Sequence, residues 1–141
     1  MSIESKLYAI LSSTFGTELY PVVHPDPDGT SSEVAELYAI FVKAGGRTFP
    51  TMEGDSNLRR PRMQISIYGI NFDNVVAKEA AVIAAMAAAN AVASAAIALG
   101  NDPLTATGSL PNIAVGVPVD GYESDTKRFV KHLEFYVWER T

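Results

Sequence analysis

The sequence predicts an α+β domain in which a mainly antiparallel sheet carries a short N-terminal helix and a long Ala-rich helix on one face. Two observations predict this class. Segments with strand patterns are bunched together along the chain instead of alternating with helices. Only two segments have helical patterns, one at the N-terminus and one in the middle. The chain of 141 residues is long enough to bury a sizeable core, so we expect residues 1–141 to form a single domain.

Composition and charge limit the classes of function. Hydrophobic residues make up 48% of the chain, which is typical of a globular protein. The net charge of −5 argues against a protein whose main task is to hold nucleic acid by its phosphates. The absence of Cys excludes a disulfide framework, a thiolate zinc site and a Cys nucleophile, and it fits the cytoplasm most simply. The N-terminus lacks the pattern of a signal peptide, so we expect none.

The N-terminal third of the chain predicts a helix, an edge strand and a central strand. Apolar residues at Ile3, Leu7, Ile10 and Leu11 keep helical spacing, and the helix should end near Phe15. Residues 19–23 predict a short strand, which Pro21 places at a sheet edge or at its own beginning. Residues 24–32 read as a loop, and residues 37–43 predict a strand that is apolar on both sides and therefore central.

A polar segment from Gly45 to Arg60 follows and predicts a long loop. It separates two strands that should pair, and long loops are usually functional or mobile. The second of these strands spans residues 62–68 and alternates with period two, so Met63, Ile65 and Ile67 should face a core.

The long Ala-rich helix is predicted from Val75 to Leu99, with Asp73 or Asn74 as its cap. At 100° per residue, one side collects the large apolar residues and the other collects Ala. The large apolar residues are Phe72, Val75, Val82, Ile83, Met86 and Ile97. Because no charged residue follows Glu79, the Ala side is either a close-packed subunit interface or simply solvated. The interface candidates are Ala84, Ala88, Ala91 and Ala95.

A membrane span is the alternative for this helix. Ala is nearly neutral to insertion, and no basic residue follows Leu99. The chain instead runs into Gly100 and a turn, which is typical of soluble proteins. We therefore predict no contact with a membrane.

The C-terminal part predicts a turn-rich link at residues 101–111, a strand at 113–117, a polar turn at 121–125 and a final strand at 127–139. Aromatic residues occur on both faces of the final strand, which is typical of a half-buried or interface strand. Tyr136 and Trp138 are therefore further candidates for a subunit interface.

Candidate residues for chemistry are few. His24, Asp26 and Asp28 could bind a metal, but the calcium-loop pattern fails because Glu33 comes too soon after Gly29. A proline-stiffened turn explains them better. His132 lies among aromatics in a strand and should be a packed, hydrogen-bonded histidine. We predict no catalytic residue, no cofactor and no metal site.

One basic cluster stands out in this acidic chain. Arg59, Arg60 and Arg62 follow the long polar segment. They are explained either as a solvated strand entrance paired with Glu53 or Asp55, or as a contact to a partner or to nucleic acid.

The order of these segments resembles the tail-completion, or tail-terminator, proteins of long-tailed bacteriophages and prophages. The resemblance covers nearly the whole chain and is most specific in two strands. These are the strand with Arg62, Gln64 and Ile65 before the long helix, and the closing strand with Asp125, Arg128 and Phe129. The Ala-rich helix and the long 101–111 link depart from the pattern of the family.

The resemblance implies a structural role without catalysis. It implies a homohexameric ring that caps the tail tube, ends tube polymerisation and presents a surface to the head-side connector protein. The expected partners are a second copy of the chain, the tail tube protein, the connector protein and, transiently, DNA in the lumen at Arg59, Arg60 and Arg62. The expected location is the virion tail, after assembly in the host cytoplasm.

Two other classes stay open. One is a small α+β enzyme or ligand-binding domain with a pocket between helix and sheet and with His24 or His132 as its polar group. The other is a different head-to-tail connector component.

Overall fold

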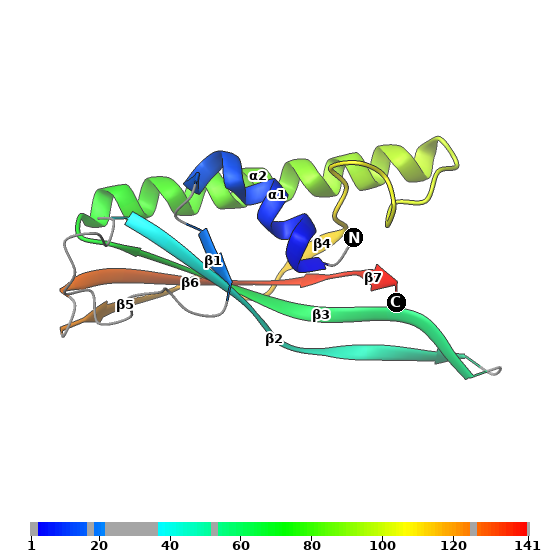
Figure 1. Cartoon of the computed structure of the whole chain (residues 1–141), viewed down its shortest axis with the longest axis horizontal. Helices are drawn as coiled ribbons and strands as arrows, with labels where there is room; N and C mark the ends of the chain where they lie inside the picture. The colour runs from blue at the N-terminus through cyan, green and yellow to red at the C-terminus, as the bar shows by residue number, and fades with distance from the viewer. Residues whose placement is uncertain (1–2, 17–18, 22–36, 52–53, 125–126, 141) are drawn as a thin grey trace.

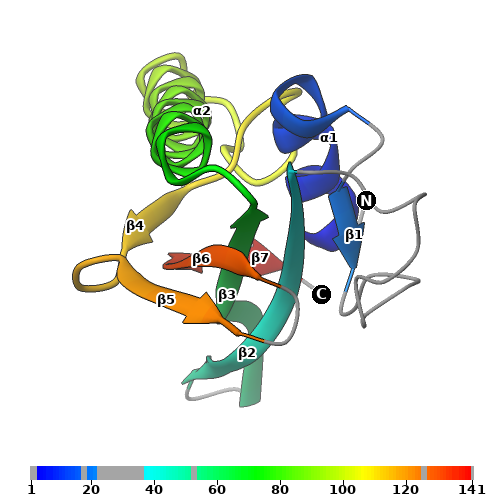
Figure 2. The ribbon, with the colours of Figure 1, turned by 90° about the vertical axis from the view of Figure 1, so that its left-hand side faces the viewer.

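Two helices lie on one face of a mixed, mostly antiparallel sheet (Figures 1 and 2). The computed structural model describes residues 3–16, 19–21, 37–51, 54–124 and 127–140. Its elements are α1 (Ile3–Phe15), β1 (Leu19–Pro21), β2 (Leu37–Thr51), β3 (Gly54–Gly69), α2 (Phe72–Ala98), β4 (Asn112–Ala114), β5 (Val119–Glu123), β6 (Arg128–Val137) and β7 (Glu139–Arg140). This arrangement confirms the predicted α+β class.

The sheet has the order β1-β2-β3-β6-β4, with β5 also paired to β6 and β7 to β3. The pair β1 and β2 is parallel, and the other pairs are antiparallel. Because β5 pairs with residues 128–132 and β4 with residues 135–137, these two short strands share one edge of β6. Among the described strands β1 lies at an edge of the sheet, which is one of the two positions that Pro21 predicted.

The core lies between the helices and the sheet. Ile3, Leu7, Leu11 and Phe15 are buried at four-residue spacing, which confirms the predicted helix α1. Alternate residues of β3 and β6 meet them from the sheet, and burial of this apolar surface is the main force that holds the two layers together. These sheet residues are Met63, Ile65, Ile67, Leu133, Phe135 and Val137.

The phase of α2 differs from the prediction. Val75, Val82 and Met86 are buried as expected, whereas Ile83 and Ile97 are exposed. Phe72, from the same predicted side of the helix, is also exposed, although its ring packs against Phe129 at 5.4 Å between centroids. The buried stripe continues instead through Ala89, Ala93 and Ala96. Small side chains there let the segment after the helix approach closely. In this close contact the Leu110 N–H donates a hydrogen bond to the Ala89 carbonyl.

The start of α2 is capped differently from the prediction. Asn71, not Asp73 or Asn74, is the cap, and its Oδ1 accepts a hydrogen bond from the Asp73 N–H at 2.9 Å. The helix therefore begins three residues earlier than Val75.

The predicted long loop from Gly45 to Arg60 is wrong. Strands β2 and β3 continue into a hairpin that extends away from the rest of the sheet (Figure 1), and we call residues 43–61 the arm. Two bulges interrupt its pairing, one between Lys43 and Gly46 and one between Thr48 and Pro50. Gly45 has a φ of 125°, which explains the glycine at the first bulge.

The region after α2 also differs in detail. The predicted strand 113–117 ends at Ala114, because Gly116 adopts a φ of 64° and Pro118 follows it. The predicted polar turn at 121–125 is wrong at its start, since Gly121 lies inside β5. The predicted final strand is present as β6, with β7 after Trp138.

Candidate interaction surfaces

Two arginines of the cluster, Arg60 and Arg62, form one surface with Tyr136 and Trp138 at the base of the arm. The Arg60 guanidinium lies 4.3 Å from the centroid of the Tyr136 ring and 6.0 Å from that of Trp138. Strands β3 and β6 pair here in antiparallel register, with Arg62 opposite Tyr136. Arg60 and Arg62 therefore share a face of the sheet with Tyr136 and Trp138, whereas Arg59, which pairs with Glu139, lies on the opposite face.

Arg62 and Arg59 have different surroundings. The Arg62 Nε lies 3.8 Å from the Glu134 Oε2, an ion pair at the half-exposed sheet surface. Arg59 is exposed. The carboxylates suggested as partners, Glu53 and Asp55, have side chains outside the described part of the structure. Arg59 is thus the member of the cluster with the most accessible charge, and Arg60 and Arg62 are held against the sheet.

The four interface candidates on α2 are exposed in the single chain. Ala84, Ala88, Ala91 and Ala95 lie on the side of the helix that points away from the core. At 100° per residue they span a narrow sector opposite the buried stripe. We call these four residues the outward Ala side.

A second exposed apolar surface, not predicted from the sequence, follows the β4–β5 edge of the sheet from the flank of α2 to the face without helices. We call it the edge surface. Its members are Val76 and Ile83 on α2, Ile113 on β4, and Val119 and Tyr122 on β5, each at least 40% exposed. The Asn112 N–H donates to the Asn90 Oδ1 at 3.2 Å, which fixes β4 beside this flank of the helix. In the sequence, the apolar residues between Pro111 and Ser124 could have indicated this surface.

His132 is hydrogen-bonded within the sheet, as predicted. Its Nδ1 lies 2.7 Å from the Ser66 Oγ and 3.3 Å from the Gln64 Nε2. Ser66 is buried and alternates with core residues Ile65 and Ile67, so this cluster lies on the sheet face opposite the helices. His132 therefore cannot be the polar group of a pocket between helix and sheet.

Lys131 is a buried cation that joins α2 to the sheet edge. Its Nζ lies 2.9 Å from the Glu79 Oε2 and also contacts the Asp120 Oδ1, while its side chain is only 10% exposed. Hydrogen bonds to Asp120 and then to Glu79 raise the pKa of Lys131 above its usual value, although burial opposes this. The sequence carried the signal, because Lys131 interrupts the alternate apolar residues Phe129, Leu133 and Phe135.

Replacing Lys131 with Met is expected to destabilise the fold by about 2–4 kcal/mol, because the mostly buried Glu79 carboxylate loses its partner. Asp120→Asn is the matched control. Asp120 is 59% exposed, so its loss should cost at most about 1 kcal/mol. Urea unfolding at pH 7 measures both changes. Equal losses for the two variants would contradict a buried ion pair centred on Glu79.

Alkaline pH is expected to destabilise the protein. Burial raises the pKa values of Tyr38 and Tyr68, which stack at 5.0 Å, and hydrogen bonds raise that of Lys131. The unfolded chain therefore releases these protons first as pH rises. Stability from these groups is complete below their unfolded values of 10.0 and 10.5 and is lost as pH rises through the folded values.

Thermal melts between pH 8 and about pH 11 measure this loss. Tyr38→Phe and Tyr68→Phe should each flatten the alkaline decline, and Tyr8→Phe, at an exposed position, should leave it unchanged. A melting temperature that is flat to pH 11 would contradict the prediction.

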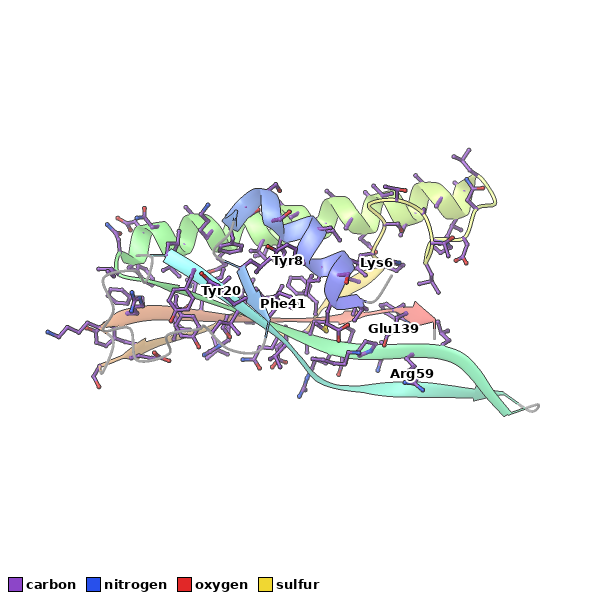
Figure 3. All side chains as sticks on the ribbon, in the orientation of Figure 1. Lys6, Tyr8, Tyr20, Phe41, Arg59 and Glu139 are labelled. Atoms are coloured by element: carbon purple, nitrogen blue, oxygen red, sulfur yellow. The ribbon has the colours of Figure 1, made fainter. Side chains whose placement is uncertain are left out.

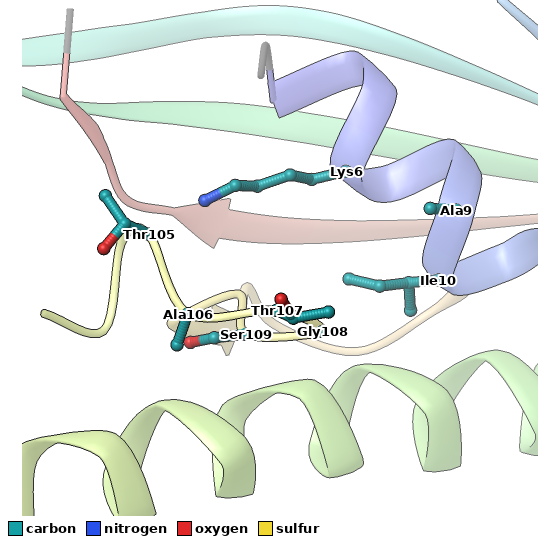
Figure 4. A pocket seen from close by; sticks show the side chains of 8 residues that line it. All are labelled: Lys6, Ala9, Ile10, Thr105, Ala106, Thr107, Gly108 and Ser109. Carbon is teal, nitrogen blue, oxygen red and sulfur yellow. The ribbon is translucent and has the colours of Figure 1, made fainter. Parts of the chain in front are cut away.

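A cavity of about 380 Å³ lies between α1 and the link that follows α2 (Figure 4). Its described lining is mostly apolar and consists of Lys6, Ala9, Ile10, Thr105, Ala106, Thr107, Gly108 and Ser109. The Lys6 ammonium donates to the Leu104 carbonyl, and the Ser109 hydroxyl donates to the Pro103 carbonyl at 2.5 Å. The polar groups of Lys6 and Ser109 are thus already engaged with the backbone of the link.

The remaining sequence candidates are not brought into a site. His24, Asp26 and Asp28 lie outside the described residues. Among the residues that are described, no three His, Asp or Glu side chains are grouped closely enough to hold a metal ion. Helix α2 is long and apolar enough to cross a membrane by length and composition alone, and 28% of an 18-residue apolar window of it is buried against the fold.

Arg59 on β3 and Glu139 on β7 lie opposite each other where the two strands pair (Figure 3). Comparison with known proteins adds no family: no family model matches the chain, and no curated protein is similar enough to count as a relative.

Proposed function

We propose that the chain is a structural subunit of a ring that caps a phage-type tail tube, ends tube polymerisation and forms the joining surface toward the head. The observation that supports this most is the exposed face of α2. The helix has 27 residues, yet no charged residue follows Glu79, and the outward Ala side is exposed. A long helix with an uncharged exposed face is typical of a surface that another molecule covers.

The other surfaces fit the same role. Arg59 at the arm offers an accessible positive charge for the tail tube protein, for the head-side connector protein or for DNA that passes through the lumen. The proposal needs no catalytic residue and no cofactor. The protein would assemble in the host cytoplasm and remain in the tail of the virion.

Light scattering on the purified protein, alone and mixed with tail tubes, tests this proposal. Six chains of 15.1 kDa give a ring of about 91 kDa. Subunits that are monomeric in dilute solution would assemble at tube ends, since association depends on concentration. A strict monomer that never binds tube ends would contradict the proposal.

A small-molecule-binding domain is the second candidate, and the cavity beside α1 favours it. An apolar ligand would lie against Ala9 and Ile10. Ile10→Trp should fill part of this space and abolish saturable binding of an apolar fluorescent probe. Unchanged probe binding in this variant would remove the cavity from consideration, and the ring test above is independent of it.

A further inference from the structure

The sheet has an open edge on each side in the part of the chain that is described. On one side, β4 and β5 pair with β6 alone. On the other side, β1 covers β2 only from Ala39 to Phe41, so β2 has no described partner on its outer edge from Val42 to Thr51. Open edges offer rows of backbone donors and acceptors to another strand.

The β4–β5 edge is also apolar on both faces of the sheet. Val119 pairs with His132 and Ile113 with Tyr136, which places both side chains on the face without helices. They are 61% and 57% exposed. Tyr122 pairs with Phe129 on the helix face, beside the flank of α2. Exposed apolar side chains on both faces of an open sheet edge are typical of a surface that a further strand covers.

The arm is the edge of this chain that can reach another molecule. It extends beyond the body of the fold (Figure 1), and β7 pairs with it at Leu58 and Arg59 on the β3 side. The β3 side of the arm is therefore partly paired with β7, whereas its β2 side has no partner among the described strands. The charges are complementary too, since β2 carries Arg47 within the arm and the β5 edge carries the exposed Glu123.

We propose that the outer edge of the arm pairs with the β4–β5 edge of a second copy of the chain. The two edges lie on opposite sides of the sheet, so the contact is head to tail, and such contacts close into rings when the rotation between subunits permits. The closure of these contacts into a ring rests on the proposed function, whereas the pairing of the two edges does not. The added strand buries the edge surface on both faces and extends the sheet from one subunit to the next.

Two variants, each blocking one edge, test the pairing. The edge variant carries Ile113→Lys and Val119→Lys, because charges on an edge strand prevent the addition of a further strand. The arm variant replaces residues 48–59 with Asn-Gly, which forms tight hairpin turns. Circular dichroism and thermal melts verify that both variants fold.

Each variant alone should be monomeric where the wild-type protein forms rings. Their equimolar mixture should give a dimer of about 30 kDa and stop there, because each pair retains one intact arm and one intact edge. Rings formed by either variant alone would overturn the inference. So would a mixture that stays monomeric under conditions where the wild-type protein assembles.

A disulfide test decides the pairing even if the wild-type protein is monomeric. The natural chain has no Cys, so single cysteines report single positions. Chains with Val119→Cys are mixed under mild oxidation with chains that carry Cys at position 47, 48 or 49, and Ser13→Cys on α1 is the control. Mixed disulfides should exceed homodimers for at least one arm position and not for Ser13.

The two proposals fail in different ways. No excess of mixed disulfide for any arm position overturns the edge pairing. Rings that persist in both blocked variants overturn the pairing and leave the ring subunit standing. A wild-type protein that neither forms rings nor binds tube ends removes the proposed function, while the disulfide result still decides the edge contact.

Discussion

Replacing Ala88 with Glu is expected to abolish the ring while the folded chain keeps its stability. Ala88 is exposed on the outward Ala side, so the carboxylate reaches water in the free subunit. The cost to the fold should stay within about 0.5 kcal/mol. In a close-packed seam the same carboxylate would be buried without a partner in every subunit, which costs several kcal/mol per contact.

Ala91→Glu should behave in the same way, because Ala91 lies in the same sector of the helix. Asn74→Glu is the matched control, since it adds the same charge to an exposed position of α2 that is already polar. Light scattering and binding to tube ends are measured for all three variants. Normal rings from Ala88→Glu and Ala91→Glu would show that the outward Ala side is solvated.

The fold was predictable wherever one face of an element is buried by large side chains. Ile3, Leu7 and Leu11 recur at helical spacing and are all buried, and β3 shows period two from Met63 to Ile67. In these segments the buried face and the sequence pattern have the same period, so the element and its orientation follow from the sequence.

The orientation of α2 was only partly predictable. Large apolar side chains suggested a face that includes Ile83, but the buried stripe runs through Ala89 and Ala93. Ala has little preference for either side of a helix, so the approach of Leu110 decides which alanines are covered. That approach is a long-range contact, and no local pattern reports it.

The arm escaped prediction for a different reason. Gly45, Gly46 and Pro50 are residues typical of loops, yet here they lie at bulges within a continuing hairpin. The arm projects beyond the helix-covered core (Figure 1), and its sequence carries no alternation of apolar and polar residues. A pattern method that depends on a buried face cannot distinguish such a hairpin from a loop.

The contact between Arg60 and Tyr136 could be identified only from the register of the sheet. The two residues are far apart in the chain and meet because β3 and β6 pair antiparallel, with Arg62 opposite Tyr136. Both residue types could be chosen from the sequence as candidates for contacts. Their association could not, because strand order and register are set by the packing of the whole sheet.

Arg59 and Arg60 are expected to respond differently to substitution, although they are neighbours. Arg60 lies over the Tyr136 ring, so Arg60→Gln should lower the free energy of unfolding by about 0.5–2 kcal/mol. Arg59 is exposed, so Arg59→Gln should leave the melting temperature nearly unchanged. Thermal melts of the two single variants separate the structural arginine from the accessible one.

Arg59→Glu should nevertheless weaken the capping of tail tubes, by about tenfold or more at low salt. The substitution reverses one charge in each subunit, and a ring repeats the change around its circumference, so the field toward an acidic tube end or toward DNA is altered as a whole. Lys127→Glu is the matched control: Lys127 is exposed and precedes β6 at the end of the sheet opposite the arm, and its reversal should change capping little. The difference between Arg59→Glu and the wild-type protein should shrink as salt rises toward about 1 M, where the screening length is only about 3 Å. If Arg59→Glu caps tubes normally at low salt, the basic end of the arm does not face the tube, and a role in holding the arm itself becomes the better explanation of the cluster.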